Sequence, residues 1–204
     1  MKKVFLASAR NVGQQCIQWA KSNTPDGFEI VDDIESSDIV ISVLYDKILP
    51  IQVLKDKKCF NFHPGILPEY KGVGIYSWVL INGEEKTGVT LHLIDRGVDT
   101  GDIIEIREFL ISKKDTAFSL QQRGEKVILK MFKDWYRDLL VGNYIAVPQN
   151  PNKGTVYRKR DLQKAMNLTK FARAFHFPEK PPAFFINDKS EKIYLHYSKK
   201  ETIQ

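Results

Sequence analysis

The fold of this chain is decided by a run of seven residues, Asp38–Leu44, with the sequence DIVISVL. Its near-continuous β-branched residues are typical of a strand that is buried on both faces of a parallel sheet. Similar apolar runs occur at Val4–Ala9, Phe28–Asp32 and Lys58–Phe62. Between the first two of them, Gln14–Ala20 has the apolar spacing of a helix. Strands that alternate with helical segments predict an open, mostly parallel α/β sheet.

The later half of the chain continues this pattern. Its periodicity predicts two further strands and two helices, over Thr87–Ile94, Ile103–Leu110, Gly74–Asn82 and Thr116–Val141. A loop rich in Pro and Gly follows at Asn143–Val156. The last apolar runs, Ala183–Ile186 and Lys192–His196, flank an Asn-Asp turn and predict a β-hairpin.

The composition is that of an ordinary globular protein. The chain has 204 residues, of which 43% are hydrophobic, which suffices for one domain with a sizeable core. No stretch approaches the roughly 20 apolar residues of a membrane-spanning helix, and Arg10 cuts the first apolar run too short for a signal peptide. Cys16 and Cys59 lack the spacing of a disulfide framework or a zinc site. We therefore expect a cytoplasmic protein with no metal site and no membrane partner.

The net charge and the glycine pattern say little about which class of ligand the protein binds. A net charge of +6 and a pI of about 9.1 fit anionic ligands but select none of them. No Gly-x-Gly-x-x-Gly segment follows the first strand, which argues against a dinucleotide site.

Two polar side chains stand at the carboxyl end of a predicted strand. Asn61 and His63 lie at the end of the run Lys58–Phe62 and just beyond it. Because side chains at i and i+2 of a strand point to the same side, this pair shares one face while Phe60 and Phe62 face the core. Ligands of open α/β sheets bind beyond the carboxyl ends of the strands. The pair is therefore placed where a binding site is expected.

A carboxylate lies in a turn 36 residues after His63. Asp99–Asp102 reads DTGD, a turn signal with its glycine at a position that needs an unusual φ. Each pattern alone is also typical of an ordinary polar loop. Together they supply an amide donor, an imidazole and a carboxylate, which are the groups that acyl transfer to an amine requires.

Four segments together resemble one enzyme family. They are NFHPGILP at Asn61–Pro68, YKG at Tyr70–Gly72, TGVT at Thr87–Thr90 and DRGVDTGD at Asp95–Asp102. Similar segments occur in the formyltransferases that use 10-formyltetrahydrofolate, which include glycinamide ribonucleotide, methionyl-tRNA and sugar-nucleotide N-formyltransferases. The resemblance is strong over about Asp38–Ile106. It implies a Rossmann-like formyltransferase domain over residues 1–150, followed by a C-terminal helix and β-hairpin over residues 151–204.

By this resemblance the catalytic residues are Asn61, His63 and Asp99. When an amine attacks a formyl group on a folate nitrogen, negative charge develops on the oxygen of the tetrahedral intermediate. Asn61 would donate an N–H to that oxygen, a contribution typically worth ~10²–10³ in rate. His63 would stabilise the oxyanion or take a proton from the amine, and Asp99 would orient His63 and help to move the proton.

The resemblance also implies a site for 10-formyltetrahydrofolate, the co-substrate. The loop Leu44–Pro50 is similar to the segment whose backbone holds the pterin ring in this family, although by itself it reads as an ordinary strand-to-helix loop. The expected folate contacts are Leu44, Tyr45, Asp46, Ile48, Leu49, Asp95 and Val98. His92 matches a histidine of some family members and is either a structural histidine or a support for the site.

The C-terminal segment points to the acceptor. Lys170–Pro178 and Pro181–Phe184 resemble a segment of the sugar-nucleotide N-formyltransferases, and so does Gly154–Arg160. This implies an amino sugar linked to dTDP or UDP, such as 4-amino-4,6-dideoxyglucose, as used in O-antigen and polysaccharide biosynthesis. Cations can grip the diphosphate and aromatic rings can stack on the base. The expected substrate contacts are Lys71, Tyr76, Trp78, Arg173, Phe175 and Phe184, although the phenylalanines suit a hairpin core equally well.

Two alternative functions remain, and the sequence also bears on nucleic-acid binding and on dimer formation. A glycinamide ribonucleotide formyltransferase is weakened because Ala7–Gly13 holds a single glycine where those enzymes open with a Gly-rich phosphate loop. A non-catalytic folate or nucleotide binder is disfavoured because all three reactive residues are present. We expect no nucleic-acid partner, since the methionyl-tRNA enzymes carry a second domain where only a few tens of residues follow here. The terminal part often forms a dimer interface in relatives, which implies a homodimer.

Overall fold

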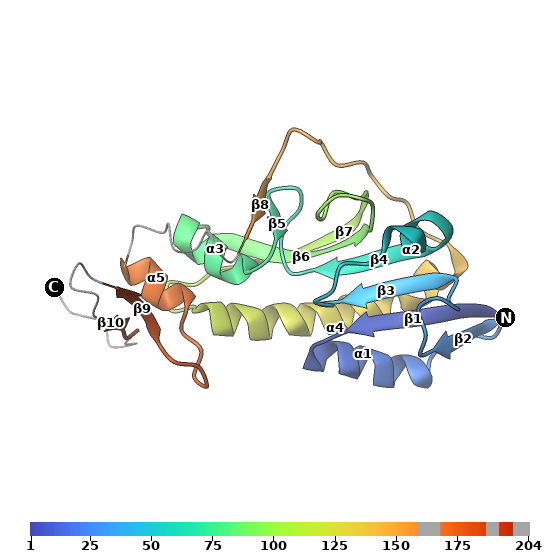
Figure 1. Cartoon of the computed structure of the whole chain (residues 1–204), viewed down its shortest axis with the longest axis horizontal. Coiled ribbons are helices and arrows are strands. Elements are labelled where there is room, and N and C mark those ends of the chain that lie inside the picture. The colour runs from blue at the N-terminus through green and yellow to red at the C-terminus, as the bar shows by residue number, and fades with distance from the viewer. Residues whose placement is uncertain (159–167, 187–191, 198–204) are drawn as a thin grey trace.

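The computed structural model describes residues 1–158, 168–186 and 192–197. Its centre is a six-stranded sheet with the strand order β2-β1-β3-β4-β6-β7 (Figure 1). The strands of this sheet are β1 (Lys2–Ser8), β2 (Phe28–Val31), β3 (Ile39–Val43), β4 (Lys58–His63), β6 (Lys86–Leu93) and β7 (Ile103–Leu110). The first four pair in parallel, whereas β6 and β7 run antiparallel to their neighbours. The predicted open, mostly parallel α/β sheet is confirmed.

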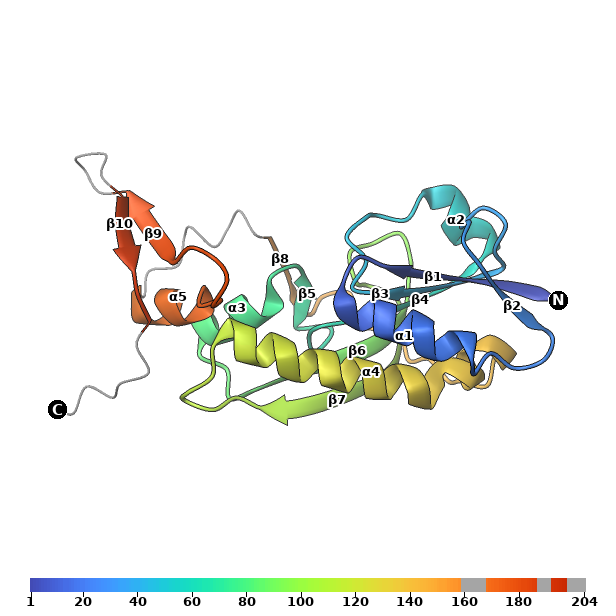
Figure 2. The ribbon, with the colours of Figure 1, turned by 90° about the horizontal axis from the view of Figure 1, so that it is seen from below.

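Two helices cover one face of this sheet. Helices α1 (Asn11–Lys21) and α4 (Ala117–Val141) lie side by side beneath it (Figure 2). Every residue of β3 is buried, as its β-branched run predicts. The strands and both helices share one core, in which the rings of Phe62 and Phe132 lie 5.7 Å apart. The short helix α2 (Ile51–Asp56) covers a smaller cluster around Val40 and Cys59 on the other face.

The long helix begins where its sequence predicts. Thr116 caps it, because its hydroxyl accepts from the backbone N–H of Ser119 while the Ser119 side chain accepts from the N–H of Thr116. This reciprocal pair satisfies two donors at the helix start. The helix ends at Gly142, whose φ of 81° is the left-handed conformation common at helix ends.

A two-stranded ribbon lies above the sheet (Figure 1). It consists of β5 (Tyr70–Gly72) and β8 (Thr155–Tyr157), which pair in parallel. β8 belongs to the return segment, residues 143–158, which leads from the end of α4 back across the sheet. The expectation of a loop over Asn143–Val156 was therefore incomplete. The pairing partner of β8 lies about 85 residues earlier, and a three-residue strand has too little periodicity to be seen in the sequence.

The C-terminal elements lie at the end of the molecule opposite the N-terminus (Figure 1). Helix α5 (Leu168–Ala174) packs on α3 (Ile75–Asn82), and the Ser77 hydroxyl donates to the carbonyl of Ala174 at 2.8 Å. β9 (Ala183–Ile186) and β10 (Lys192–Leu195) form the predicted antiparallel hairpin. Within the described ranges, no helix combines the length and the apolar character needed to cross a membrane.

Candidate active site

Asn61 and His63 lie on the same side of β4, opposite Phe60 and Phe62. Both phenylalanines are fully buried in the main core, as the alternation of the strand predicts. The His63 side chain is also almost completely buried, at 3% exposed, whereas Asn61 is half-buried. The Nε2–H of His63 donates to the carbonyl of Tyr70 at 2.7 Å. That bond ties the end of β4 to the ribbon above it.

The structure brings Asp99 to this pair across the 36 intervening residues. Its Oδ2 accepts from the backbone N–H of Gly72 at 2.8 Å and lies 3.5 Å from His63 Nδ1. Its Oδ1 lies 3.6 Å from Nε2 of His92. One carboxylate, 16% exposed, therefore faces two buried imidazole rings.

The turn that presents Asp99 differs from the expectation. The positive φ falls on Asp99, at 51°, and not on Gly101. Gly101 is needed for a different reason, because a Cβ there would meet the carbonyl oxygen of Leu93 at 1.9 Å. Inside the turn, Asp95 Oδ1 accepts from the backbone N–H of Gly97 and from the hydroxyl of Thr100.

His92 connects Asn61 to this carboxylate. It lies opposite Asn61 in the β4–β6 pairing, next to an irregularity between Leu91 and His92. Its Nδ1 donates to the carbonyl of Leu93 at 2.6 Å, and its Nε2 lies 3.2 Å from Asn61 Nδ2. Burial, together with the charge of His63, lowers the pKa of His92 to about 4, against the opposing effect of Asp99. The ring is thus neutral near pH 7, and Nε2 accepts a hydrogen bond from Asn61.

The same reasoning places a proton site between His63 and Asp99. Because Nε2 of His63 faces a carbonyl, that nitrogen carries the hydrogen of the neutral ring. Its Nδ1 then presents a lone pair toward Asp99 Oδ2. A second proton on Nδ1 would be held by the carboxylate. The arrangement therefore places the Nδ1 atom of His63 beside the carboxylate of Asp99.

The expected folate contacts occupy two loops beside this cluster. Leu44 has a φ of 52°, which turns the chain sharply after β3. Tyr45 and Leu49 pack in the small cluster over α2, and Ile94 from the Asp99 turn packs in the same cluster. Ile48 is 96% exposed and Val98 is 52% exposed. Asp46 and Asp95 are exposed at the surface of the two loops.

Three of the expected substrate contacts are side chains that are buried or hydrogen-bonded to other parts of the protein. Lys71 is buried, and its Nζ donates to the carbonyl of Lys153 at 3.1 Å. Tyr76 is buried in the cluster between α3 and α4. Arg173 donates to the carbonyls of Ser112 and Asp115 at the start of α4. The structure does not bring the side chains of Tyr76 and Arg173 to the cluster of Asn61, His63 and Asp99.

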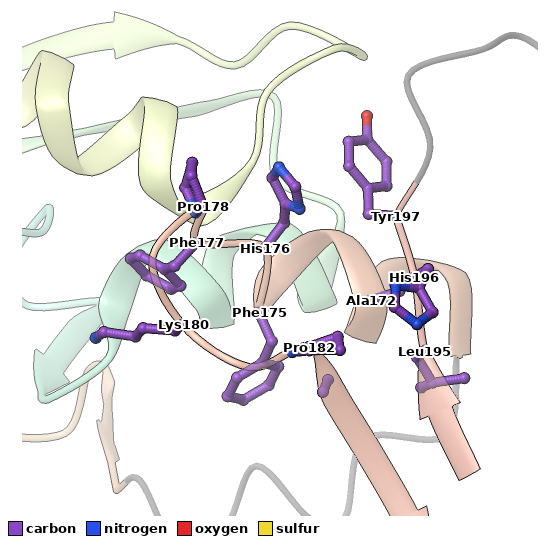
Figure 3. Close-up of a pocket in the computed structure, with 11 residues that line it drawn as sticks. Ala172, Phe175, His176, Phe177, Pro178, Lys180, Pro182, Leu195, His196 and Tyr197 are labelled. Atoms are coloured by element: carbon purple, nitrogen blue, oxygen red, sulfur yellow. The ribbon is translucent and has the colours of Figure 1, made fainter.

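The three remaining aromatic residues are spread over the C-terminal side. Phe175 lines a cavity of about 160 Å³ between α5 and the hairpin, together with His176 and Tyr197 (Figure 3). Phe184 is 41% exposed on β9. The Trp78 ring lies 4.9 Å from the ring of Tyr157 in the ribbon.

A larger groove, of about 680 Å³, opens beside the ribbon. The rings of Tyr70 and Tyr157 line it and stack 5.0 Å apart. Its charged lining residues are Glu69, Glu84, Lys86 and Glu108. The one ammonium among these four is paired with Glu108 at 2.8 Å, so the lining is acidic and disfavours a diphosphate. Across the described part of the chain, no three His, Cys, Asp or Glu residues are grouped so that they could hold a metal ion.

Comparisons with known proteins place the chain in one family. A family model described as "Formyl transferase" matches residues 8–134. The methionyl-tRNA formyltransferase of Alkaliphilus oremlandii is 38% identical over 135 residues, which cover 62% of this chain and 42% of that protein. The chain thus spans less than half the length of this relative. The GDP-perosamine N-formyltransferase of Brucella melitensis is 32% identical over 176 residues, which cover 80% of this chain and 66% of that protein.

Solved structures share the fold. A sugar N-formyltransferase from a Shewanella species superposes with a TM-score of 0.84 at 19% identity, over 100% of both chains. An N-formyltransferase from Helicobacter canadensis, solved with folinic acid and dTDP-3-aminofucose, has a TM-score of 0.74 at 25% identity. That superposition covers 88% of this chain and 82% of the other.

Proposed function

Because the chain belongs to the formyl transferase family, we propose that it transfers the formyl group of 10-formyltetrahydrofolate to the amine of a nucleotide-linked amino sugar. The observation that carries this proposal is the cluster at the end of β4, where Asp99 faces His63 and His92 and where Asn61 is oriented by His92. These residues come from three separate segments of the chain, yet they converge on one carboxylate.

The cluster supplies each group that the reaction needs. One N–H of Asn61 is bonded to His92, which leaves its second N–H for the oxygen that becomes negative in the tetrahedral intermediate. The amine nitrogen forms a bond to the formyl carbon, and the bond from that carbon to the folate nitrogen then breaks. The proton that the amine loses would pass through Asp99 and His63, whose Oδ2 and Nδ1 atoms lie 3.5 Å apart, and would end on the folate nitrogen.

The loops beside the cluster suit the co-substrate. Ile48 and Val98 expose large apolar side chains on the two loops, a surface that a flat pterin ring would cover. The positive φ of Leu44 turns the backbone of the first loop, which the family resemblance assigns to pterin binding. We place the reaction in the cytoplasm, in keeping with the two free, buried cysteines.

The extent of the sequence match favours a sugar acceptor. The alignment with the GDP-perosamine enzyme covers 80% of this chain, whereas the alignment with the methionyl-tRNA enzyme covers 62%. The Helicobacter neighbour was solved with a dTDP-linked amino sugar. The acceptor's diphosphate requires cations other than Arg173, since its guanidinium is already bonded to two carbonyls.

Methionyl-tRNA is the second candidate acceptor. The highest identity among the relatives named above, 38%, is to a methionyl-tRNA formyltransferase. Formylation of this tRNA would also suit the positive net charge of the chain.

Product analysis by mass spectrometry tests the proposal. The protein is incubated with 10-formyltetrahydrofolate and one acceptor at a time: GDP-, dTDP- and UDP-linked 3-amino and 4-amino sugars, glycinamide ribonucleotide, and methionyl-tRNA. A gain of one formyl group on an amino sugar supports the proposal. Formylation of the tRNA alone would indicate the second candidate function. Formylation of the ribonucleotide alone would indicate a glycinamide ribonucleotide formyltransferase. An inactive protein that still binds folate would be a binding protein.

A further inference from the structure

The return segment contacts the Asp99 turn through one side chain. Val147 first pairs with Ile103 at the start of β7 through two backbone hydrogen bonds of 2.8 Å. Two residues later, Gln149 Nε2 donates to the carbonyl of Asp99 at 3.0 Å and to that of Gly101 at 2.6 Å. Gln149 therefore bonds both sides of the turn that presents the carboxylate.

The chemistry of these two contacts fixes which way the amide points. Both partners are carbonyl oxygens, so the nitrogen end of the amide must face them. The two hydrogens of the amide nitrogen match the two carbonyls. The other end, Oε1, is buried and has no hydrogen-bond partner among the residues that the structure describes. A buried acceptor without a partner is costly, so the contribution of this side chain comes from its two donor bonds.

The bonds act on a strained part of the backbone. A φ of 51° is uncommon for a residue with a side chain and costs free energy unless its surroundings stabilise it. At Asp99 two groups do so. The N–H of Gly72 bonds the carboxylate, and Gln149 bonds the backbone carbonyl of the same residue. Both groups belong to segments that meet in the β5–β8 ribbon.

We propose that Gln149 is a positioning residue that holds the Asp99 turn in the conformation that aims the carboxylate at His63 and His92. The effect of Gln149 on catalysis rests on the proposed function, since it requires that Asp99 acts in formyl transfer. The effect of Gln149 on the position of the Asp99 carboxylate does not, and that position can be measured without any substrate.

The amide proton of Gly72 is a direct reporter of that position. It donates to Asp99 Oδ2, so its NMR chemical shift and its hydrogen-exchange protection change when the carboxylate moves. We compare the full-length protein with Gln149→Leu, which keeps the approximate volume but removes both donors. Asp99→Ala gives the signal of a missing carboxylate. The control is Gln122→Leu, the same substitution at an exposed position of α4.

In the Gln149→Leu protein, the Gly72 amide is expected to shift and to lose protection in the direction seen for Asp99→Ala, while the control matches the wild type. For the acceptor that the wild type formylates, kcat is expected to fall about 10- to 100-fold, since small displacements of catalytic groups cost this much. The KM is expected to stay within about threefold.

Two results would overturn the inference. One is a folded Gln149→Leu protein in which the Gly72 amide is unchanged. The other is an equal loss of kcat in Gln122→Leu, which would indicate a general effect of the substitution. If the wild type formylates no acceptor while the Gly72 amide responds as expected, the proposed function fails and the positioning role stands.

Discussion

The neutral imidazole of His92 determines how Asn61 is oriented. Its Nδ1 hydrogen is bonded to the carbonyl of Leu93, so Nε2 is an acceptor and the amide of Asn61 must turn its nitrogen toward it. Protonation would replace this acceptor with a donor, so the Asn61 nitrogen would lose its partner and the amide would have to turn its oxygen toward the ring. The lowered pKa, about 4, keeps the ring neutral at physiological pH.

This shift predicts a measurable pH dependence of stability. The unfolded state binds a proton at His92 near pH 6.5, whereas the folded state does so only near pH 4. The unfolded state thus holds more protons between these values, and the free energy of unfolding falls as the pH drops. In His92→Gln, the loss between pH 7 and pH 5 should be smaller by about 2 kcal/mol. Urea unfolding of the wild type and of His92→Gln at pH 7 and pH 5 measures this loss of unfolding free energy. Identical losses in the two proteins would contradict the prediction.

Removal of the reactive side chains tests the mechanism separately. We expect Asn61→Ala and His63→Ala each to lower kcat/KM by at least ~100-fold, because each removes a group that acts in the transition state. Folate binding, measured by calorimetry, should change little. Losses below about tenfold in both variants would refute the assigned roles.

At the scale of the elements, the packing of α4 against α3 explains the placement of Tyr76. The helix interior contains Gly124, where a Cβ would lie 1.7 Å from the Tyr76 hydroxyl oxygen. Glycine there costs up to about 1 kcal/mol relative to alanine, and this contact explains why alanine does not fit. We expect Gly124→Ala to lower the free energy of unfolding by about 1–3 kcal/mol through overpacking.

Tyr76→Phe, in contrast to Gly124→Ala, should not lower the free energy of unfolding. The hydroxyl is buried and has no hydrogen-bond partner within the described ranges, so its removal should leave stability unchanged or raise it by about 1 kcal/mol. The KM for the acceptor should not change, because the ring is buried in the cluster between α3 and α4. A fivefold rise in KM, measured in the formylation assay, would restore Tyr76 to the substrate site.

The elements that the sequence predicts are those with strong local signals. Asp38–Leu44 and Thr116–Val141 carry a β-branched run and a helical periodicity, and both lie within one residue of the observed ends. The ribbon has no such signal, because β5 and β8 exist only through pairing with each other. The site divides in the same way. Asn61, His63 and Asp99 follow from a motif, whereas Gln149 depends on a contact across 50 residues.

For the whole molecule, the exposed apolar side chains of the hairpin bear on the expected homodimer. Phe184 and Tyr194 are 41% and 49% exposed, and their rings lie 5.7 Å apart at the end farthest from the N-terminus. Burial of this surface against a second copy would stabilise a dimer.

We expect a dimer in sedimentation experiments, and a monomer after Phe184→Ser combined with Tyr194→Ser. Ile145→Ser, at an 83% exposed position elsewhere, is the control. A monomeric wild type would contradict the prediction.

The path of the return segment also sets an order of events during translation. All six strands of the sheet, and the two helices α1 and α4 that cover one face of it, are complete once Val141 has left the ribosome. Gln149 and β8 emerge later, and until then Tyr70–Gly72 lacks its parallel partner and the carbonyl of Asp99 lacks its donor. Contacts between distant parts of a chain form only after both parts exist. The strands of the sheet are therefore synthesised before the segment that completes the ribbon and bonds the Asp99 turn.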